Sequence, residues 1–302
     1  MHIVRQLALV LLAVGVMLVA PGAAHAKIKI GASIPDLGSI AGTVGGDQVE
    51  VFTLARANSD AHRVEVLPSY MVQVSRANLY LKVGLGLDQW ADGIIDGSRN
   101  SKLRVFDCSR GITPLDKPAS ASAAGGDVHP MGNPHYWLDP RNGAIVAASI
   151  AEQLGQLDPP HAADYRARAQ AFAKQVDEAY ARQVKVARAL PSRTILSYHS
   201  SWVYLAKAFD LEIAATAEPV PGIPPTGKHL QELVEIAKAR KIQVFLQEPY
   251  FSEEAGKFLT RQSGVRVLKA APSCDSVQPG SYLAHFDTIL GGIAGAPAGA
   301  KP

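Results

Sequence analysis

The sequence predicts an α/β protein of two lobes, each with a parallel sheet covered by helices, joined by one long rigid helix. Short apolar runs alternate with amphipathic stretches in the first half of the chain, and the same alternation returns in the second half. Between the halves, apolar residues recur at helical spacing over residues 161–190. Strands that alternate with helices are typical of parallel sheets with helices on both faces.

The N-terminal segment 1–26 has the three parts of a signal peptide. A basic start at Arg5 precedes an apolar run over residues 7–20, and small residues stand at the cleavage positions before Lys27. A membrane anchor is the alternative, but the apolar run is shorter than the ~20 residues that a spanning helix needs. We therefore expect cleavage after Ala26 and a soluble protein in the periplasm.

Residues 27–160 are predicted to form the first lobe. Its expected elements are strands at 27–33, 49–54, 79–83 and 103–106, and helices beginning at 35 and covering 64–75 and 87–95. Residues 111–134 are rich in Ala, Ser, Gly and Pro and break this pattern. They predict a loop at the mouth of the lobe, or a flap over it.

Residues 161–190 form the predicted linking helix, without an internal proline or glycine. At about 1.5 Å per residue this helix would be about 45 Å long, more than one lobe requires. A surface helix with a frayed end is the alternative. Residues 191–302 are the predicted second lobe, with strands at 194–198, 211–215, 242–246 and 265–269 and a clear amphipathic helix at 230–240.

The charge balance argues against a nucleic-acid partner. Lysine and arginine number 30 against 27 aspartates and glutamates, and the basic residues are scattered without interleaved aromatic clusters. The two cysteines, Cys108 and Cys274, are far apart in the sequence. In an oxidising compartment they could pair; the alternatives are two buried thiols, or Cys274 as a neighbour of a metal. Neither a glycine-rich phosphate loop nor a nucleophile elbow is present.

Side chains that can bind a metal stand a few residues beyond the predicted strands. His62 follows the second strand of the first lobe, and His199 directly follows the first strand of the second lobe. Glu248 and Asp275 follow its third and fourth strands. Ligands bind beyond the carboxyl ends of parallel strands, so these groups could meet in one cleft. Each also has a structural alternative, as a hydrogen-bonded strand end, a helix cap or a turn.

His135 lies in the stretch 133–140, which reads Asn-Pro-His-Tyr-Trp-Leu-Asp-Pro. The prolines on both sides stiffen the backbone that presents the imidazole. For Trp137 and Asp139 we favour structural roles, as a core anchor and as the cap of the following helix. His129, in the predicted loop, is expected to be solvated.

Four stretches, in this order along the chain, are similar to motifs of the metal-specific periplasmic solute-binding proteins of ABC transporters, cluster A-I, the ZnuA/TroA-like family. Residues 84–90 are similar to a glycine-rich segment that ends in Glu-x-Trp. Residues 133–140 are similar to Asp-Pro-His-x-Trp-Leu-Asp-Pro, with Asn133 in place of the first aspartate. Residues 199–211 are similar to a segment that begins with a histidine and an aromatic residue, with Asp210 where glycine is usual, and residues 245–252 are similar to Phe-x-x-Glu-Pro-x-Phe-Ser. The resemblance covers nearly all of the chain after the signal segment.

The resemblance implies a divalent metal ion held by four residues, His62, His135, His199 and Asp275. Glu248 resembles a glutamate near the family's cleft and is expected to stabilise the ligands without binding the ion itself. Three imidazoles and one carboxylate favour zinc, with manganese or ferrous iron as alternatives. Some zinc receptors of the family carry a long histidine-rich loop, whereas residues 111–134 contain one histidine. In the family the first ligand usually follows proline, but here Ala61 precedes it and Arg63 follows it.

The expected function is therefore high-affinity binding of one metal ion between the lobes and its delivery to the membrane permease of an ABC transporter. A periplasmic metallochaperone is a second candidate partner, and we expect a monomer that is not an enzyme. A zinc-dependent hydrolase with Glu248 as its base is the alternative of another class, although the helical His-Glu-x-x-His motif is missing. An adhesin, or a receptor for an organic solute such as a haem or a siderophore, is the third.

Overall fold

The computed structural model describes residues 26–118 and 129–295, so the predicted signal peptide and part of the 111–134 loop lie outside it. Two four-stranded parallel sheets confirm the predicted two-lobed α/β fold, and they share one strand order, β2-β1-β3-β4 in the first lobe and β6-β5-β7-β8 in the second. The strands are β1 (Ile28–Ala32), β2 (Val49–Thr53), β3 (Leu79–Lys82), β4 (Arg104–Asp107), β5 (Thr194–Ser197), β6 (Glu212–Thr216), β7 (Val244–Gln247) and β8 (Arg266–Lys269).

The helices cover the sheets and link the lobes. They are α1 (Pro35–Gly45), α2 (Pro68–Val74), α3 (Trp90–Ser98), α4 (Pro140–Leu157), α5 (Ala162–Arg188), α6 (Val203–Phe209), α7 (Gly227–Ala239), α8 (Glu254–Ser263) and α9 (Ser281–Ala294). A proline begins α1, α2 and α4, where its missing N–H costs no helical hydrogen bond. Asp139 caps α4 by accepting a hydrogen bond from the backbone N of Arg141 at 3.0 Å, as predicted.

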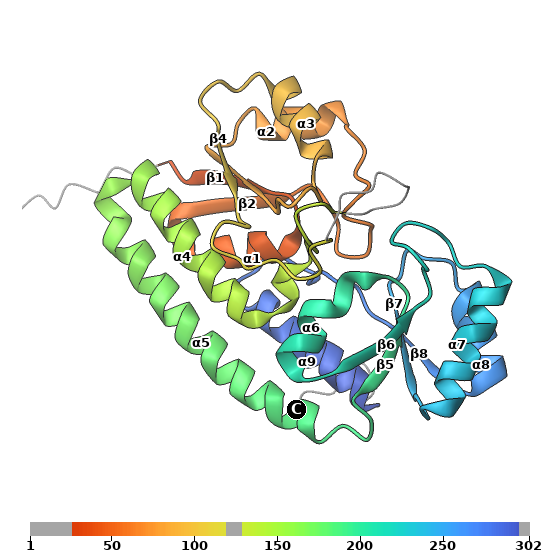
Figure 1. Ribbon diagram of the computed structural model, residues 1–302. Coiled ribbons are helices and arrows are strands. Elements are labelled where there is room, and N and C mark those ends of the chain that lie inside the picture. The colour runs from red at the N-terminus through yellow and green to blue at the C-terminus, as the bar shows by residue number, and fades with distance from the viewer. Residues whose placement is uncertain (1–25, 119–128, 296–302) are drawn as a thin grey trace, which may run out of the picture.

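Helix α5 confirms the predicted link between the lobes. Figure 1 shows it beside α4 along one flank, passing from the first lobe to the second. Its buried side chains recur at helical spacing, beginning with Tyr165, Ala169, Phe172 and Val176. These residues face α1 and α4 of the first part of the chain and α9 of the last part. The helix is thus packed along much of its length, unlike a surface helix with a frayed end.

The two lobes share one continuous apolar core, which includes residues of α1, α4, α5, α6 and α9. The buried Trp137 donates from Nε1 to the carbonyl of Pro272 at 2.8 Å, and the Tyr282 hydroxyl donates to the carbonyl of Trp137 at 2.7 Å. Gly143 lets α4 approach α9, because a Cβ there would lie 2.4 Å from the ring of Tyr282. A large apolar interface opposes relative motion of the lobes.

Cys108 and Cys274 are both buried free thiols, so they do not form a disulfide. Of the helices in residues 26–118 and 129–295, none has the length and apolar character needed to cross a membrane.

Asp36, on the first turn of α1, is a buried carboxyl group where the helix meets the loop after β8. Its Oδ1 accepts from the backbone N of Cys274 at 3.2 Å, whereas its Oδ2 has no hydrogen-bond partner in the described part of the chain. Burial raises the pKa of Asp36 to about 7, although hydrogen bonds from Cys274 and Ser273 act in the opposite direction.

Replacing Asp36 by asparagine should flatten the pH dependence of stability. A carboxyl group with a raised folded-state pKa stabilises the fold below its unfolded pKa of about 3.9, and this contribution is lost as pH rises through about 7. In wild type the free energy of unfolding should therefore decline by at most about 1.4 kcal/mol per pH unit because of this group, and Asp36→Asn should remove that decline. Urea unfolding between about pH 4 and 8 measures it. The exposed Asp47→Asn control should keep the wild-type slope. An unchanged slope in Asp36→Asn would contradict this account.

Candidate metal centre

Three histidines from distant parts of the chain meet between the lobes. One potential ligand atom from each of His62, His135 and His199 lies within 4.8 Å of the other two. Their ring centroids are 5.2 Å apart for His62 and His135, and 5.5 Å apart for each of the other two pairs. Ligand nitrogens around a tetrahedral zinc ion are about 3.3 Å apart, so a small contraction would complete such a site. The structure thus brings together all three predicted histidines.

The sheet topology positions these rings. His62 lies in the loop after β2, His199 lies two residues after the end of β5, and His135 precedes the short 3-10 turn Tyr136–Leu138. The rings are withdrawn from solvent, since His135 is 2% and His199 is 3% exposed, while the side chain of His62 is 8% exposed. Loops after parallel strands therefore supply two of the three imidazoles, and a short turn supplies the third.

Two of the rings are held by the residue two positions earlier in the chain. Oδ1 of Asp60 accepts from the backbone N of His62 and contacts its Nδ1, both at 2.9 Å. Oδ1 of Asn133 does the same for His135, both at 3.0 Å. Burial, followed by the neighbouring His62 and His199, lowers the pKa of His135 well below its usual value, so this ring stays neutral. A neutral imidazole with its Nδ1 engaged has Nε2 as its metal-binding nitrogen.

The third ring is held by Glu218, which sequence reasoning did not identify. Its Oε2 accepts from Nδ1 of His199 at 2.5 Å, and both side chains are buried. Burial lowers the pKa of His199, but the hydrogen bond that it donates to Glu218 and the charge of Glu248 outweigh this effect, so the pKa is raised. The sequence feature that could have identified Glu218 is its position shortly after β6, the strand that pairs with β5.

Glu248 lies next to the cluster but not in it. This buried residue accepts from Oγ of Ser201 at 2.8 Å through Oε1. Its Oε2 has no hydrogen-bond partner among residues 26–118 and 129–295. Burial raises the pKa of Glu248 to about 7. Because Ser201 is two residues after His199, Glu248 reaches the ligand segment indirectly, and its predicted supporting role stays a prediction.

Asp275, the predicted fourth ligand, is not brought to the three histidines. It is exposed on the loop after β8 and lines a surface pocket that also includes Pro35 and Tyr70. The residue before it, Cys274, is buried and donates its backbone N–H to Asp36. This anchoring leaves the Asp275 side chain on the outside, away from the cluster.

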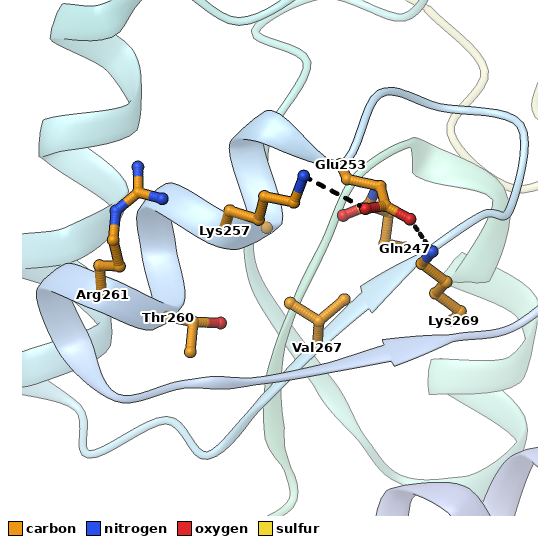
Figure 2. A pocket seen from close by; sticks show the side chains of 8 residues that line it. Gln247, Glu253, Lys257, Thr260, Arg261, Val267 and Lys269 are labelled. Atoms are coloured by element: carbon orange, nitrogen blue, oxygen red, sulfur yellow. Dashed lines mark hydrogen bonds and ion pairs between the residues drawn. The ribbon is translucent and has the colours of Figure 1, made fainter.

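Another pocket, in the second lobe, has different chemistry. Figure 2 shows that it lies between α8 and β8, where Lys257 and Lys269 both contact the carboxylate of Glu253. None of the eight residues lining it is a histidine or a cysteine. This pocket therefore lacks the ligands of the three-histidine cluster.

Comparisons with known proteins identify the family. The model of the ZnuA family, "Zinc-uptake complex component A periplasmic", matches residues 30–296. The chain belongs to this family. Among its relatives, a putative metal-binding protein of Treponema pallidum (strain Nichols) is 26% identical over 247 residues, 80% of this chain and 78% of that protein. The iron-binding protein YfeA of Yersinia pestis is 25% identical over 245 residues, 80% and 75% of the two chains.

A crystal structure of ZnuA superposes with a TM-score of 0.79 at 27% identity, covering 90% of this chain and 99% of that one. As a member of the ZnuA family, the chain is a metal-binding solute-binding protein and not an enzyme.

Asn133 also ties the ligand segment to the second lobe. Its Nδ2 donates to the carbonyl of Ser200 at 2.8 Å, while the hydroxyl of Tyr204 donates to the carbonyl of Asn133 at 2.8 Å. An aspartate, usual at this position of the family motif, could not donate to Ser200. The asparagine therefore has a role that the carboxylate cannot fill.

Removing the carboxylate behind His199 should change its titration. Glu218→Gln should lower the pKa of His199, because a neutral amide no longer stabilises the imidazolium. The measurement is an NMR titration of the histidines in metal-free protein. Glu212→Gln, the same change at the exposed start of β6, should leave the pKa of His199 at its wild-type value. An equal effect of both substitutions would contradict the assignment.

Asn133→Asp should destabilise the contact between the lobes. The new carboxylate would face the Ser200 carbonyl without a proton to donate, which should lower the free energy of unfolding by about 1 to 3 kcal/mol. Chemical unfolding of metal-free protein at about pH 7.5 measures the loss. Asn58→Asp, at an exposed position, serves as the control and should have little effect. Equal stability of both variants would show that the hydrogen bond to Ser200 contributes nothing.

Proposed function

We propose that this protein binds one divalent metal ion, zinc in the first place, through Nε2 of His62, His135 and His199, and delivers it to the membrane permease of an ABC transporter. The convergence of the three rings carries the proposal. In each ring an oxygen occupies Nδ1 and leaves Nε2 as the metal-binding nitrogen. A buried cluster oriented in this way matches what a high-affinity receptor requires.

The ligand chemistry favours zinc. Imidazole suits zinc, whereas manganese prefers oxygen ligands. The carboxylates of Asp60 and Glu218 do not bind the ion in this proposal. They contact the Nδ1 atoms of His62 and His199, so they offset the charge of the ion and make these two rings better electron donors to it. The family description names zinc, and the relative YfeA is an iron-binding protein, so ferrous iron and manganese are the alternatives.

The place of action follows from the sequence. With segment 1–26 removed as a signal peptide, the receptor would be a soluble monomer of the periplasm. His62 is the least buried of the three rings and lies on a loop, so the ion would enter and leave on its side. A permease that draws this loop away would remove one ligand and weaken binding without separating the lobes.

Metal titration of the purified chain tests the proposal. Isothermal calorimetry at about pH 7.5 should show one zinc ion per chain, and competition should show weaker binding of manganese. His135→Ala combined with His199→Ala should abolish this binding. The control, His161→Ala combined with His229→Ala, removes two histidines outside the cluster and should retain it.

The apparent affinity should also fall as pH drops toward and below 6.5, because His199, with its raised pKa, becomes protonated and a protonated ring cannot bind the ion. Unaltered stoichiometric binding in the His135→Ala, His199→Ala variant would refute the site.

A further inference from the structure

A fourth histidine, His129, lies beside the three-histidine cluster. Its ring centroid is 5.3 Å from that of His62, with 30° between the ring planes. This separation equals those within the cluster, which run from 5.2 to 5.5 Å. The charge of His129 also contributes to lowering the pKa of His135, after burial and the other two rings. The ring was expected to be solvated, but its Nε2 is buried, so that expectation is wrong.

The backbone after His129 is held in place. The N–H of Gly132 donates to the carbonyl of His129 at 3.0 Å, and the N–H of Asn133 donates to the carbonyl of Leu115 at 2.7 Å. Gly132 has a φ of +108°, and a Cβ there would lie 2.8 Å from the Leu115 carbonyl oxygen, so only glycine fits. His129 therefore sits on a packed turn that continues directly into the segment carrying His135.

The sequence around His129 repeats the pattern found at two cluster ligands. Asp60 precedes His62 by two residues, and Asn133 precedes His135 by two residues; in both pairs the side-chain oxygen holds Nδ1 and leaves Nε2 for a metal. Asp127 stands two residues before His129 in the sequence, although it lies outside the described residues. The sequence pattern of Asp or Asn, any residue and His thus occurs three times in the chain.

Three histidines leave one position open on a tetrahedral ion. Asp275 is exposed, and neither Asp275 nor Glu248 belongs to the group of ligand atoms that lie within 4.8 Å of one another. Glu248 is held through its Oε1 by Ser201, in the second lobe, although its buried Oε2 has no hydrogen-bond partner among the described residues. We propose that His129 supplies the fourth ligand, so that four imidazoles hold the ion. This inference rests on the proposed metal-binding function. The ring does not belong to the set within 4.8 Å, so it must approach the ion when the metal binds.

Four imidazoles would form a site without a carboxylate. Such a site leaves the formal +2 charge on the ion and offers only nitrogen to it, which favours zinc over manganese. His129 would then contribute to selectivity as well as to affinity.

Cobalt(II) is the probe that reports coordination, because its visible absorption is intense in tetrahedral sites and weak at higher coordination numbers. Metal-free wild type, His129→Ala, Asp275→Asn and Met131→Ala would each be titrated with cobalt and, in competition with a chromophoric chelator, with zinc. Met131 lies in the same turn and is 61% exposed, so Met131→Ala controls for disturbance of the turn.

We expect Asp275→Asn and Met131→Ala to match the wild-type spectrum. His129→Ala should still bind one cobalt ion, but with a shifted spectrum because water replaces an imidazole. Its zinc affinity should fall at least about 10- to 100-fold, since loss of even an outer hydrogen-bond partner of a ligand has that effect. The melting temperature of metal-free His129→Ala should stay near the wild-type value, which separates loss of a ligand from loss of the fold.

A wild-type spectrum and affinity in His129→Ala would overturn the inference, and a changed spectrum in Asp275→Asn would assign the fourth position to the carboxylate instead. A weaker affinity accompanied only by a lower melting temperature, with the spectrum unchanged, would also overturn it. Wild-type protein that takes up neither cobalt nor zinc would refute the proposed function itself, which is a different outcome.

Discussion

The proposed metal centre depends on one kind of hydrogen bond, the contact between the Nδ1 of a clustered imidazole and a side-chain oxygen. Asp60, Asn133 and Glu218 each make this contact. Without it a ring could rotate, and the proton could occupy either nitrogen. With it the three Nε2 atoms have fixed directions before any ion arrives, so binding does not have to order the rings. Two of the rings also differ in protonation, since burial lowers the pKa of His135 whereas the carboxylates of Glu218 and Glu248 raise that of His199.

This arrangement requires that the lobes keep their relative position, because His199 belongs to the second lobe and the other two rings to the first. The shared core and helix α5 supply the rigidity. Asn133 adds a local connection, since one amide group holds His135 through its oxygen and the Ser200 carbonyl through its nitrogen. The same side chain therefore links ligand orientation to the contact between the lobes.

Much of this architecture could be predicted from the sequence, because parallel strands buried on both faces appear as short apolar runs and α5 has an uninterrupted helical pattern. His62, His135 and His199 were predicted from their positions after strands or within a stiff turn. The metal-binding role of Asp275 stays a prediction, because the structure leaves this residue exposed and outside the cluster, where the anchored Cys274 turns the chain outward. The position of a strand end does not determine where a later loop residue points. Glu218 was missed because strand neighbours are unknown without the sheet order. The burial of His129 beside His62 was missed because its sequence surroundings are typical of a solvated loop.

The contact between Gly143 and Tyr282 has a consequence for the evolution and engineering of such receptors. Helices α4 and α9 can pack closely at this point because residue 143 has no side chain, and any side chain there would meet the tyrosine ring. Larger side chains at position 143 would push α4 and α9 further apart, and the separation would grow with the size of the side chain. The distance between the two lobes would in this way be set from a position that touches none of the three clustered histidines.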